Sequence, residues 1–251
     1  MPYIEAWELQ RSLAAEVLLG APETIVLLEH PPVVTLGRRT DEHELHVPDH
    51  AHVEIVETDR GGKSTYHAPG QLVCYPILDL KRHGQDVKRY VRDLERAIVV
   101  TLASFGIEAG CIEGLTGVWV RPTGGPGASL ASVPSGDGAS STAPRGERRQ
   151  RRERLAEPPR KIASIGIHVS RWVTTHGFAL NVDLDLEPFT RWITACGLDD
   201  AAFTSMAREL GRPLRLDRVR LPAATALAEI FDLELEVGEP ALAVGHSDRA
   251  R

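Results

Sequence analysis

The sequence is poor in cysteine and lacks both a long apolar run and a basic N-terminal segment. Its three cysteines, Cys74, Cys111 and Cys196, are too few and odd in number for a disulfide framework, which is typical of proteins in a reducing cytosol. A membrane-spanning helix would need a run of about 18 apolar residues, and the sequence has no such run. The N-terminus, residues 1–5, lacks the basic segment followed by an apolar segment that is typical of a secretory signal. We therefore expect a cytoplasmic protein that does not bind membranes.

An excess of positive charge is also missing. The net charge of −6 over 251 residues argues against a general nucleic-acid binder. Apolar residues make up 42% and charged residues 25% of the chain, which are ordinary values for a globular protein. The chain can therefore bury a core as one large domain or as two small ones.

One stretch lacks the apolar residues that a core requires. Between residues 122 and 144, 20 of 23 residues are Gly, Ala, Ser, Thr or Pro, too few apolar groups to offset the entropy of ordering. The basic run that follows, at 145–154, is either a dock for an acidic partner or a solvated linker, and the linker is the commoner case. We interpret 122–159 as a flexible low-complexity insertion within one domain, 1–238, and 239–251 as a disordered tail.

Hydrophobic periodicity predicts the elements on both sides of this insertion. Apolar residues recur at helical spacing through 87–105, and Gly106 ends that helix. The nearly continuous apolar run at 72–80 is typical of a buried strand, and the alternating segments at 165–169 and 178–182 indicate an antiparallel pair. Further helices are expected at 7–19 and 223–231, and further strands at 24–29, 52–58, 117–121 and 233–237. The irregular mixture predicts an α+β domain with a mixed or antiparallel sheet.

A polar, glycine-rich loop at 60–71 separates two strand patterns and supplies candidates for substrate binding. Two adjacent glycines let a ligand approach the backbone closely, Arg60 offers a fixed charge, and His67 can donate or accept near neutral pH. A plain hairpin turn with a glycine bulge explains the same composition equally well. The candidates are Arg60, Gly61, Gly62, Lys63, Ser64, Thr65, Tyr66 and His67.

Two residues are candidates for catalysis, although each has an ordinary explanation. Cys196 lies in the loop 194–198, and a thiolate nucleophile there needs a basic or positive neighbour; most loop cysteines are inert. Lys161 opens a strand and is normally a surface charge, but in a desolvated site it could exchange a proton. Cys74 is expected in the core, and Cys111 has no assigned role.

Four histidines, His43, His46, His50 and His52, lie among acidic residues. Their spacing is loose for metal ligands and no cysteine joins them, so a solvated loop is the favoured interpretation and no metal is expected. Strand pairing predicts that His176 lies near the strand of Lys161.

Four stretches in this order resemble the octanoyltransferases of lipoate biosynthesis, and the resemblance covers nearly the whole chain apart from the insertion and the last residues. They are 29–37 (EHPPVVTLG), the loop 60–71 with 75–77, the strand pair 161–166 and 176–182, and 194–198 (TACGL). The resemblance implies the catalytic-domain fold shared by biotin and lipoate protein ligases, an α+β fold whose mixed, largely antiparallel sheet is flanked by helices.

The resemblance also implies an activity and its residues. An octanoyl group passes from octanoyl-acyl-carrier protein, through a thioester on Cys196, to a lysine of a lipoyl domain, with Lys161 as the partner of the cysteine. The implied acceptors are the lipoyl domains of 2-oxoacid dehydrogenase complexes and the glycine cleavage H protein, and no cofactor is implied. Besides 60–67, the implied substrate contacts are Ser164, Ile165, Gly166, His176, Gly177 and Phe178.

Two rival functions remain. An ATP-dependent lipoate or biotin ligase has the same fold but needs a nucleotide pocket and no cysteine. A non-catalytic binding module needs neither Cys196 nor Lys161, so the presence of both favours the transferase. The family usually has a tight hairpin where this chain has 122–159, which leaves the role of the insertion open. Arg38, Arg39 or Arg60 could receive an acidic carrier at the mouth of the site.

Overall fold

The computed structural model describes residues 1–120, 159–193, 202–236 and 238. Residues 121–158 and 239–251, which contain nearly all of the expected insertion and the expected tail, lie outside the described residues. Within the described ranges, no helix is both long and apolar enough to cross a membrane.

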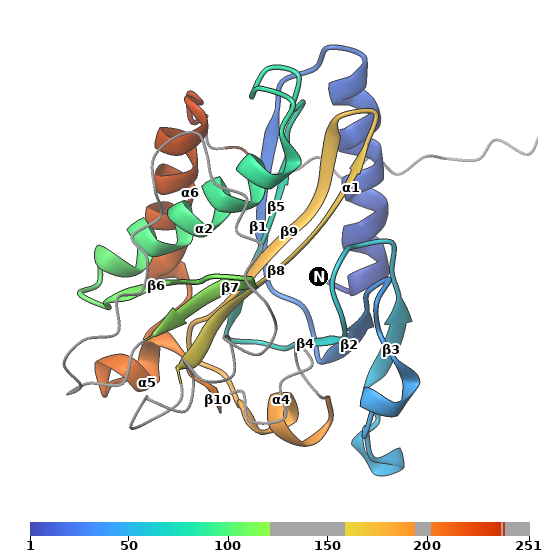
Figure 1. Ribbon diagram of the computed structural model, residues 1–251, viewed down its shortest axis with the longest axis vertical. Coiled ribbons are helices and arrows are strands. Elements are labelled where there is room, and N and C mark those ends of the chain that lie inside the picture. The colour runs from blue at the N-terminus through green and yellow to red at the C-terminus, as the bar shows by residue number, and fades with distance from the viewer. Residues whose placement is uncertain (121–158, 194–201, 237, 239–251) are drawn as a thin grey trace, which may run out of the picture.

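A seven-stranded sheet forms the centre of the fold (Figure 1). Six strands follow the order β1-β5-β9-β8-β7-β6 with antiparallel neighbours, and β10 pairs in parallel with the start of β8. Their bounds are β1 Thr24–Leu28, β5 Gln71–Ile77, β6 Ala109–Ile112, β7 Leu115–Val120, β8 Arg160–Ser170, β9 Val173–Asn181 and β10 Ala202–Phe203. The prediction of a mixed, largely antiparallel sheet flanked by helices is confirmed.

Helices cover both faces of this sheet (Figure 1). Helix α1 (Tyr3–Leu18) packs on one face, and α2 (Val87–Ala103) with α6 (Asp217–Phe231) on the other. A small second sheet of order β3-β2-β4 lies on the α1 side, where Val33 and Val56 pack against Tyr3. Its strands are β2 Val33–Leu36, β3 Glu54–Glu57 and β4 Thr65–His67; short helices are η1 Glu42–Glu44, η2 Asp49–Ala51, α4 Glu187–Arg191 and α5 Met206–Leu210.

Strand β5, which lies between β1 and β9, is apolar because both of its faces are buried. Successive side chains of a strand point to opposite faces: Leu72 and Cys74 join the core under α2 and α6, while Val73 and Tyr75 join the core under α1. Every residue of β5 is buried. The predicted buried strand is therefore confirmed.

The predicted helix at 87–105 is confirmed as α2. Its buried stripe includes Tyr90, Leu94 and Ile98, at the spacing that places side chains on one face of a helix. Asp86 caps its start by accepting hydrogen bonds from the backbone N–H groups of Lys88 (2.8 Å) and Arg89 (3.0 Å).

At the C-terminal end, the expected helix at 223–231 is confirmed as part of α6, but its start and one further prediction are wrong. Helix α6 begins at Asp217 and not at 223. The predicted strand at 233–237 is wrong for the described residues 233–236, which form no strand. Asp232 ends α6 in the left-handed conformation (φ 54°), and Leu235 remains 42% exposed, so this segment reaches no sheet edge.

The predicted antiparallel pair is confirmed as β8 and β9, with His176 opposite Ile167. Strand β7 also pairs with β8, with Trp119 opposite Lys161. The strands on both sides of the segment 121–158 are thus neighbours in one sheet. Lys161 of β8 therefore lies between two strands, β7 and β10, because Phe203 of β10 pairs with it as well.

Candidate active site

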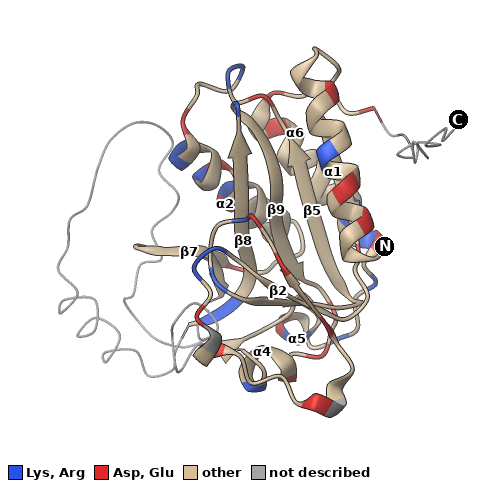
Figure 2. Cartoon of the chain, turned by 90° about the vertical axis from the view of Figure 1, so that its right-hand side faces the viewer, with Lys and Arg blue, Asp and Glu red and all other residues tan. Residues whose placement is uncertain are grey.

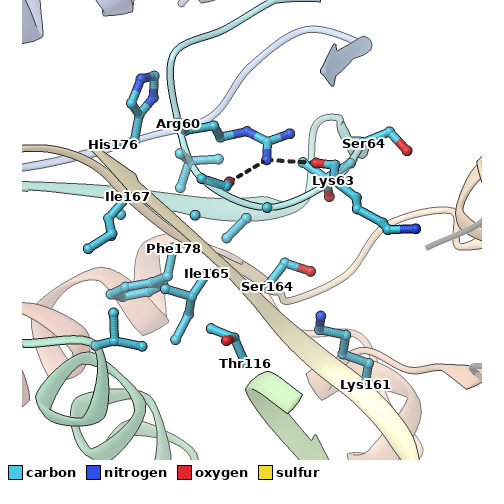
Figure 3. A pocket seen from close by; sticks show the side chains of 18 of the residues that line it. Arg60, Lys63, Ser64, Thr116, Lys161, Ser164, Ile165, Ile167, His176 and Phe178 are labelled. Carbon is cyan, nitrogen blue, oxygen red and sulfur yellow. Dashed lines mark hydrogen bonds between the residues drawn. The ribbon is translucent and has the colours of Figure 1, made fainter. Parts of the chain in front are cut away.

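A cavity of about 450 Å³ lies between β8 and β9 on one side and the loop 60–67 on the other (Figure 3). We call this loop the roof and the facing strand surface the floor. The roof contributes Arg60, Lys63 and Ser64, and the opposite side contributes Lys161 and Ser164.

The floor consists of small side chains. Ser164 and Gly166 come from β8, and Gly177 and Ala179 from β9. A Cβ atom at Gly166 would lie 2.9 Å from the carbonyl oxygen of Gly61 in the roof, so roof and floor approach as closely as the backbone allows. A narrow chain fits such a space better than a bulky group does.

Arg60 holds the roof in place. Its guanidinium, in a residue only 6% exposed, donates hydrogen bonds to the carbonyl oxygen (2.7 Å) and hydroxyl (2.8 Å) of Thr35 in β2. It also donates to the carbonyl oxygens of Gly61 (3.1 Å) and Lys63 (2.8 Å). Arg60 therefore fixes the roof to the small sheet, and the suggestion that it stands at the mouth for a carrier is wrong.

Arg38 and Arg39 are exposed next to the roof, and Arg39 lines the cavity. Their backbone N–H groups donate to the carbonyl oxygens of Arg60 (3.1 Å) and Gly62 (3.0 Å). Lys and Arg positions, coloured blue, occur on the loop in front of β8 and at the start of β8 (Figure 2). The mouth of the cavity is therefore cationic.

Three buried histidines, His30, His67 and His176, lie at the α1 side of the cavity, and we call them the histidine cluster. Nδ1–H of His30 donates to the carbonyl oxygen of Met1 (2.8 Å), and its Nε2 accepts from the hydroxyl of Tyr75 (2.7 Å). Burial lowers the pKa of His30 from 6.5 to about 4 and that of His67 from 6.5 to about 3. Both rings are therefore neutral near pH 7.

His176 connects three parts of the chain. Its residue has a left-handed backbone (φ 56°), and its N–H donates to Oε1 of Gln10 in α1 (2.6 Å). Nε2–H donates to the carboxylate of Asp59, immediately before the roof (2.7 Å). Burial lowers the pKa of His176 although Asp59 opposes the shift. His176 thus fixes one end of the roof against the sheet and α1.

Lys161 lies at the other end of the cavity. It is only 2% exposed, and its Nζ lies 5.3 Å from the ring centroid of Trp119. A Cβ atom at Gly117 would come within 2.8 Å of Cε of Lys161, so the glycine makes room for this side chain. Cys196 lies outside the described residues, and its predicted pairing with Lys161 stays a prediction.

The two described cysteines are poor nucleophiles. Cys74 is fully buried, and burial raises the pKa of its thiol well above 9.0. Burial, together with the neighbouring Glu95, raises the pKa of Cys111 from 9.0 to about 12. Because the thiolate is the attacking form, neither residue suits nucleophilic catalysis near neutral pH.

Most of the predicted substrate contacts line this one cavity. Tyr66 does not: its ring packs against Phe189 and Trp192, with ring centroids 5.6 and 5.4 Å apart. The alternation of β4 turns Tyr66 away from the cavity while His67 faces it. The predicted residues on the cavity wall are Arg60, Gly61, Gly62, Lys63, Ser64, Thr65, His67, Lys161, Ser164, Ile165, Gly166, His176, Gly177 and Phe178.

Sequence reasoning missed other wall residues because each comes from an element that reads as ordinary core. Tyr3 belongs to the first turn of α1, and Val91 to the apolar stripe of α2. Thr116 and Trp119 of β7 and Phe203 of β10 also line the cavity. Across the described residues, no group of three or more His, Cys, Asp or Glu side chains could hold a metal ion.

Known proteins resemble the chain over nearly its whole length. Residues 2–228 match the family model of the lipoyl protein ligase A/B catalytic domain. Proteins named octanoyltransferase from Mycobacterium tuberculosis and Mycobacterium leprae are each 42% identical to it. The match to the Mycobacterium tuberculosis protein covers 94% of this chain and 86% of that protein. The match to the Mycobacterium leprae protein covers 92% of this chain and 84% of that protein.

The chain belongs to the octanoyltransferase family. Its members are acyltransferases. A bipartite lipoate protein ligase from Thermoplasma acidophilum shares the fold with a TM-score of 0.60 at 16% identity, over 92% of this chain and 83% of that one. The predicted resemblance and the predicted ligase-like fold are both confirmed.

The histidine cluster makes a pH dependence of stability testable. The folded pKa values of His30 and His67 lie below the unfolded value of 6.5, so the unfolded chain binds more protons below that pH. We expect the free energy of unfolding to fall as the pH drops from about 6.5 to about 4, by up to about 3 kcal/mol for His30.

Thermal unfolding at a series of pH values measures this effect in the wild type and in His30→Gln. The variant should lose stability less steeply than the wild type on acidification. His43→Gln, which changes an exposed histidine, should follow the wild-type slope. Parallel curves for His30→Gln and the wild type would contradict the assignment.

Proposed function

We propose that the chain transfers an octanoyl group from octanoyl-acyl-carrier protein to a lysine of a lipoyl domain, through a thioester on Cys196. The observation that carries this proposal is a buried amine, Lys161, at one end of a narrow cavity with a small-residue floor. Family membership supplies the reaction class. Lipoyl domains of 2-oxoacid dehydrogenase complexes and the glycine cleavage H protein are the proposed acceptors.

Two structural observations support Cys196 as the nucleophile. The other cysteines, Cys74 and Cys111, are held as thiols by burial. Cys196 precedes Ala202 by six residues, and Ala202 pairs with Arg160 beside Lys161. Six residues span at most about 22 Å, so this short connection to β10 is compatible with the proposed pairing of Cys196 and Lys161.

The proposed cycle moves one proton back and forth. In the first step the Cys196 thiolate attacks the thioester carbonyl of the carrier. The bond to the carrier sulfur breaks, and that sulfur takes a proton from the Lys161 ammonium. In the second step the acceptor lysine attacks the Cys196 thioester, Lys161 removes its proton, and Cys196 leaves as a thiolate. The starting charges are restored, and no ATP is consumed.

The remaining cavity residues suit an acyl chain. Ile165, Ile167 and Phe178 contribute apolar side chains to the cavity wall. Each buried CH2 group stabilises the complex by about 0.8 kcal/mol, so cavity depth can select chain length. Backbone N–H groups on this wall are candidates for binding the oxyanion of each tetrahedral intermediate.

Incubation with octanoyl-acyl-carrier protein in the absence of ATP tests the proposal. We expect the intact protein to gain the mass of one octanoyl group on Cys196 and to pass it to a lipoyl domain. Cys196→Ala should show neither event, while Cys111→Ala should retain both. Transfer that requires ATP and survives Cys196→Ala would instead establish a ligase, and a complete lack of adduct would favour a binding module.

The cationic mouth is proposed to receive the acidic carrier. Reversing charge at Arg38 and Arg39 together should raise KM for the carrier about fivefold or more at low salt, since rim charges act on encounter. Added salt should shrink the difference. The matched double reversal at Arg212 and Arg218, exposed residues near α5 and α6, should leave KM unchanged. Equal KM values for the two double variants would refute this docking surface.

A further inference from the structure

A buried carboxylate on α2 has no part in the reaction described so far. Glu95 is 8% exposed and lies among apolar residues of the helix, next to Leu94 and near Ile98. Burying a charged group is costly unless it is hydrogen-bonded and compensated by an opposite charge. The surroundings of Glu95 therefore indicate what it does.

Glu95 and Lys161 approach the same residue, Gly117. The carboxylate Oε1 of Glu95 accepts a hydrogen bond from the Gly117 N–H (3.0 Å). A Cβ atom at Gly117 would lie 2.8 Å from Cε and 3.3 Å from Nζ of Lys161. Because Gly117 has no side chain, the Lys161 amine can lie against the Gly117 backbone, whose N–H binds the Glu95 carboxylate.

The electrostatics of the pair agree with this geometry. Burial raises the pKa of Glu95, while the Gly117 N–H, the Cys111 thiol and the charges of Arg92 and Lys161 act in the opposite direction. Each of these opposing groups favours the carboxylate form. A carboxylate in turn favours the ammonium form of a nearby lysine.

We propose that Glu95 is a positioning residue that holds Lys161 as an ammonium at the end of the cavity. This inference rests on the proposed function, in which the ammonium stabilises the Cys196 thiolate. It assigns to α2, on the face of the sheet opposite α1, a direct influence on the reacting pair. In the acyl-enzyme the same charge makes Lys161 a stronger base toward the attacking amine.

Other charges near Lys161 are engaged elsewhere. Arg160, the preceding residue, pairs with Glu209 of α5 at 3.0 Å. Arg92 of α2 is exposed, and Lys63 across the cavity pairs with Glu44. Strands β7 and β10 present no titratable side chain. On β6, the titratable side chain is the Cys111 thiol, which donates to Glu95.

The lysine count of the chain allows a direct test. Only four lysines exist: Lys63, Lys81, Lys88 and Lys161. Protein labelled with ¹³C at lysine Cε should give four NMR titrations, and the signal lost in Lys161→Met identifies Lys161. Glu95→Gln keeps the shape of the side chain and an acceptor for the Gly117 N–H but removes the charge. We expect it to raise the proton dissociation constant of Lys161 about tenfold.

Two variants separate charge from structure. Glu95→Asp keeps the charge, so the titration of Lys161 in this variant should lie closer to that in the wild type than the titration in Glu95→Gln does. Asp93→Asn removes a charge two residues away that pairs with Arg89 and Arg96, and it should leave Lys161 unchanged. Identical Lys161 titrations in the wild type and in Glu95→Gln would overturn the inference.

A reciprocal measurement covers the case in which Glu95→Gln does not fold. Coupling between two sites is mutual, so Lys161→Met should shift the titration of Glu95 upward by a similar factor, read from ¹³C-labelled glutamate. An unchanged Glu95 titration would equally overturn the inference. Both titrations are recorded without substrate, so they report on the Glu95–Lys161 pair whether or not Cys196 accepts an acyl group.

Discussion

The burial of one amine in the centre of a β-sheet is the constraint on which the site depends. Lys161 is the second residue of β8, flanked by β7 through Trp119 and by β10 through Phe203. A charged side chain with 2% exposure is tolerated only with compensating groups. Gly117, which has no side chain, leaves room for this amine. The Glu95 carboxylate, which binds the Gly117 N–H, provides the opposite charge in our proposal.

The cavity beside this amine is shaped by two opposing requirements. The floor side chains on β8 and β9 must stay small. Because Gly166 has no side chain, the backbone of Gly61 in the roof can lie directly against it. The roof must stay rigid although it is a loop, and the hydrogen bonds from Arg60 to Thr35 and Lys63 provide that rigidity. A preorganised narrow space loses little entropy when a chain enters.

The sequence predicted the parts of this arrangement that follow from local pattern. The apolar run at 72–80 indicated a strand buried on both faces, and the alternation around Ile165 and Phe178 indicated the antiparallel pair. Gly61 and Gly62 indicated a loop that a ligand could approach closely, with a plain hairpin turn as an equal alternative. Motif order identified the family, which composition and spacing alone did not.

Other features depend on tertiary contacts that local pattern does not encode. In the sequence, Glu95 is only a polar residue in the apolar stripe of a predicted helix. Local pattern cannot show its role, because its partner Gly117 lies on a strand 22 residues away. His176 departs from strand alternation through its left-handed backbone. The predicted strand at 233–237 failed over the described residues 233–236, because spacing alone does not supply a neighbouring strand, and these residues pair with none.

The central claim is that Lys161 keeps Cys196 ionised, and the pH dependence of Cys196 alkylation tests it most directly. Iodoacetamide reacts with thiolates, and mass spectrometry of the digested protein separates Cys196 from Cys74 and Cys111. We expect the alkylation of Cys196 to titrate below the ordinary thiol value of about 8.5 in the wild type, and at or above it in Lys161→Gln. The same alkylation profile in both proteins would contradict the account.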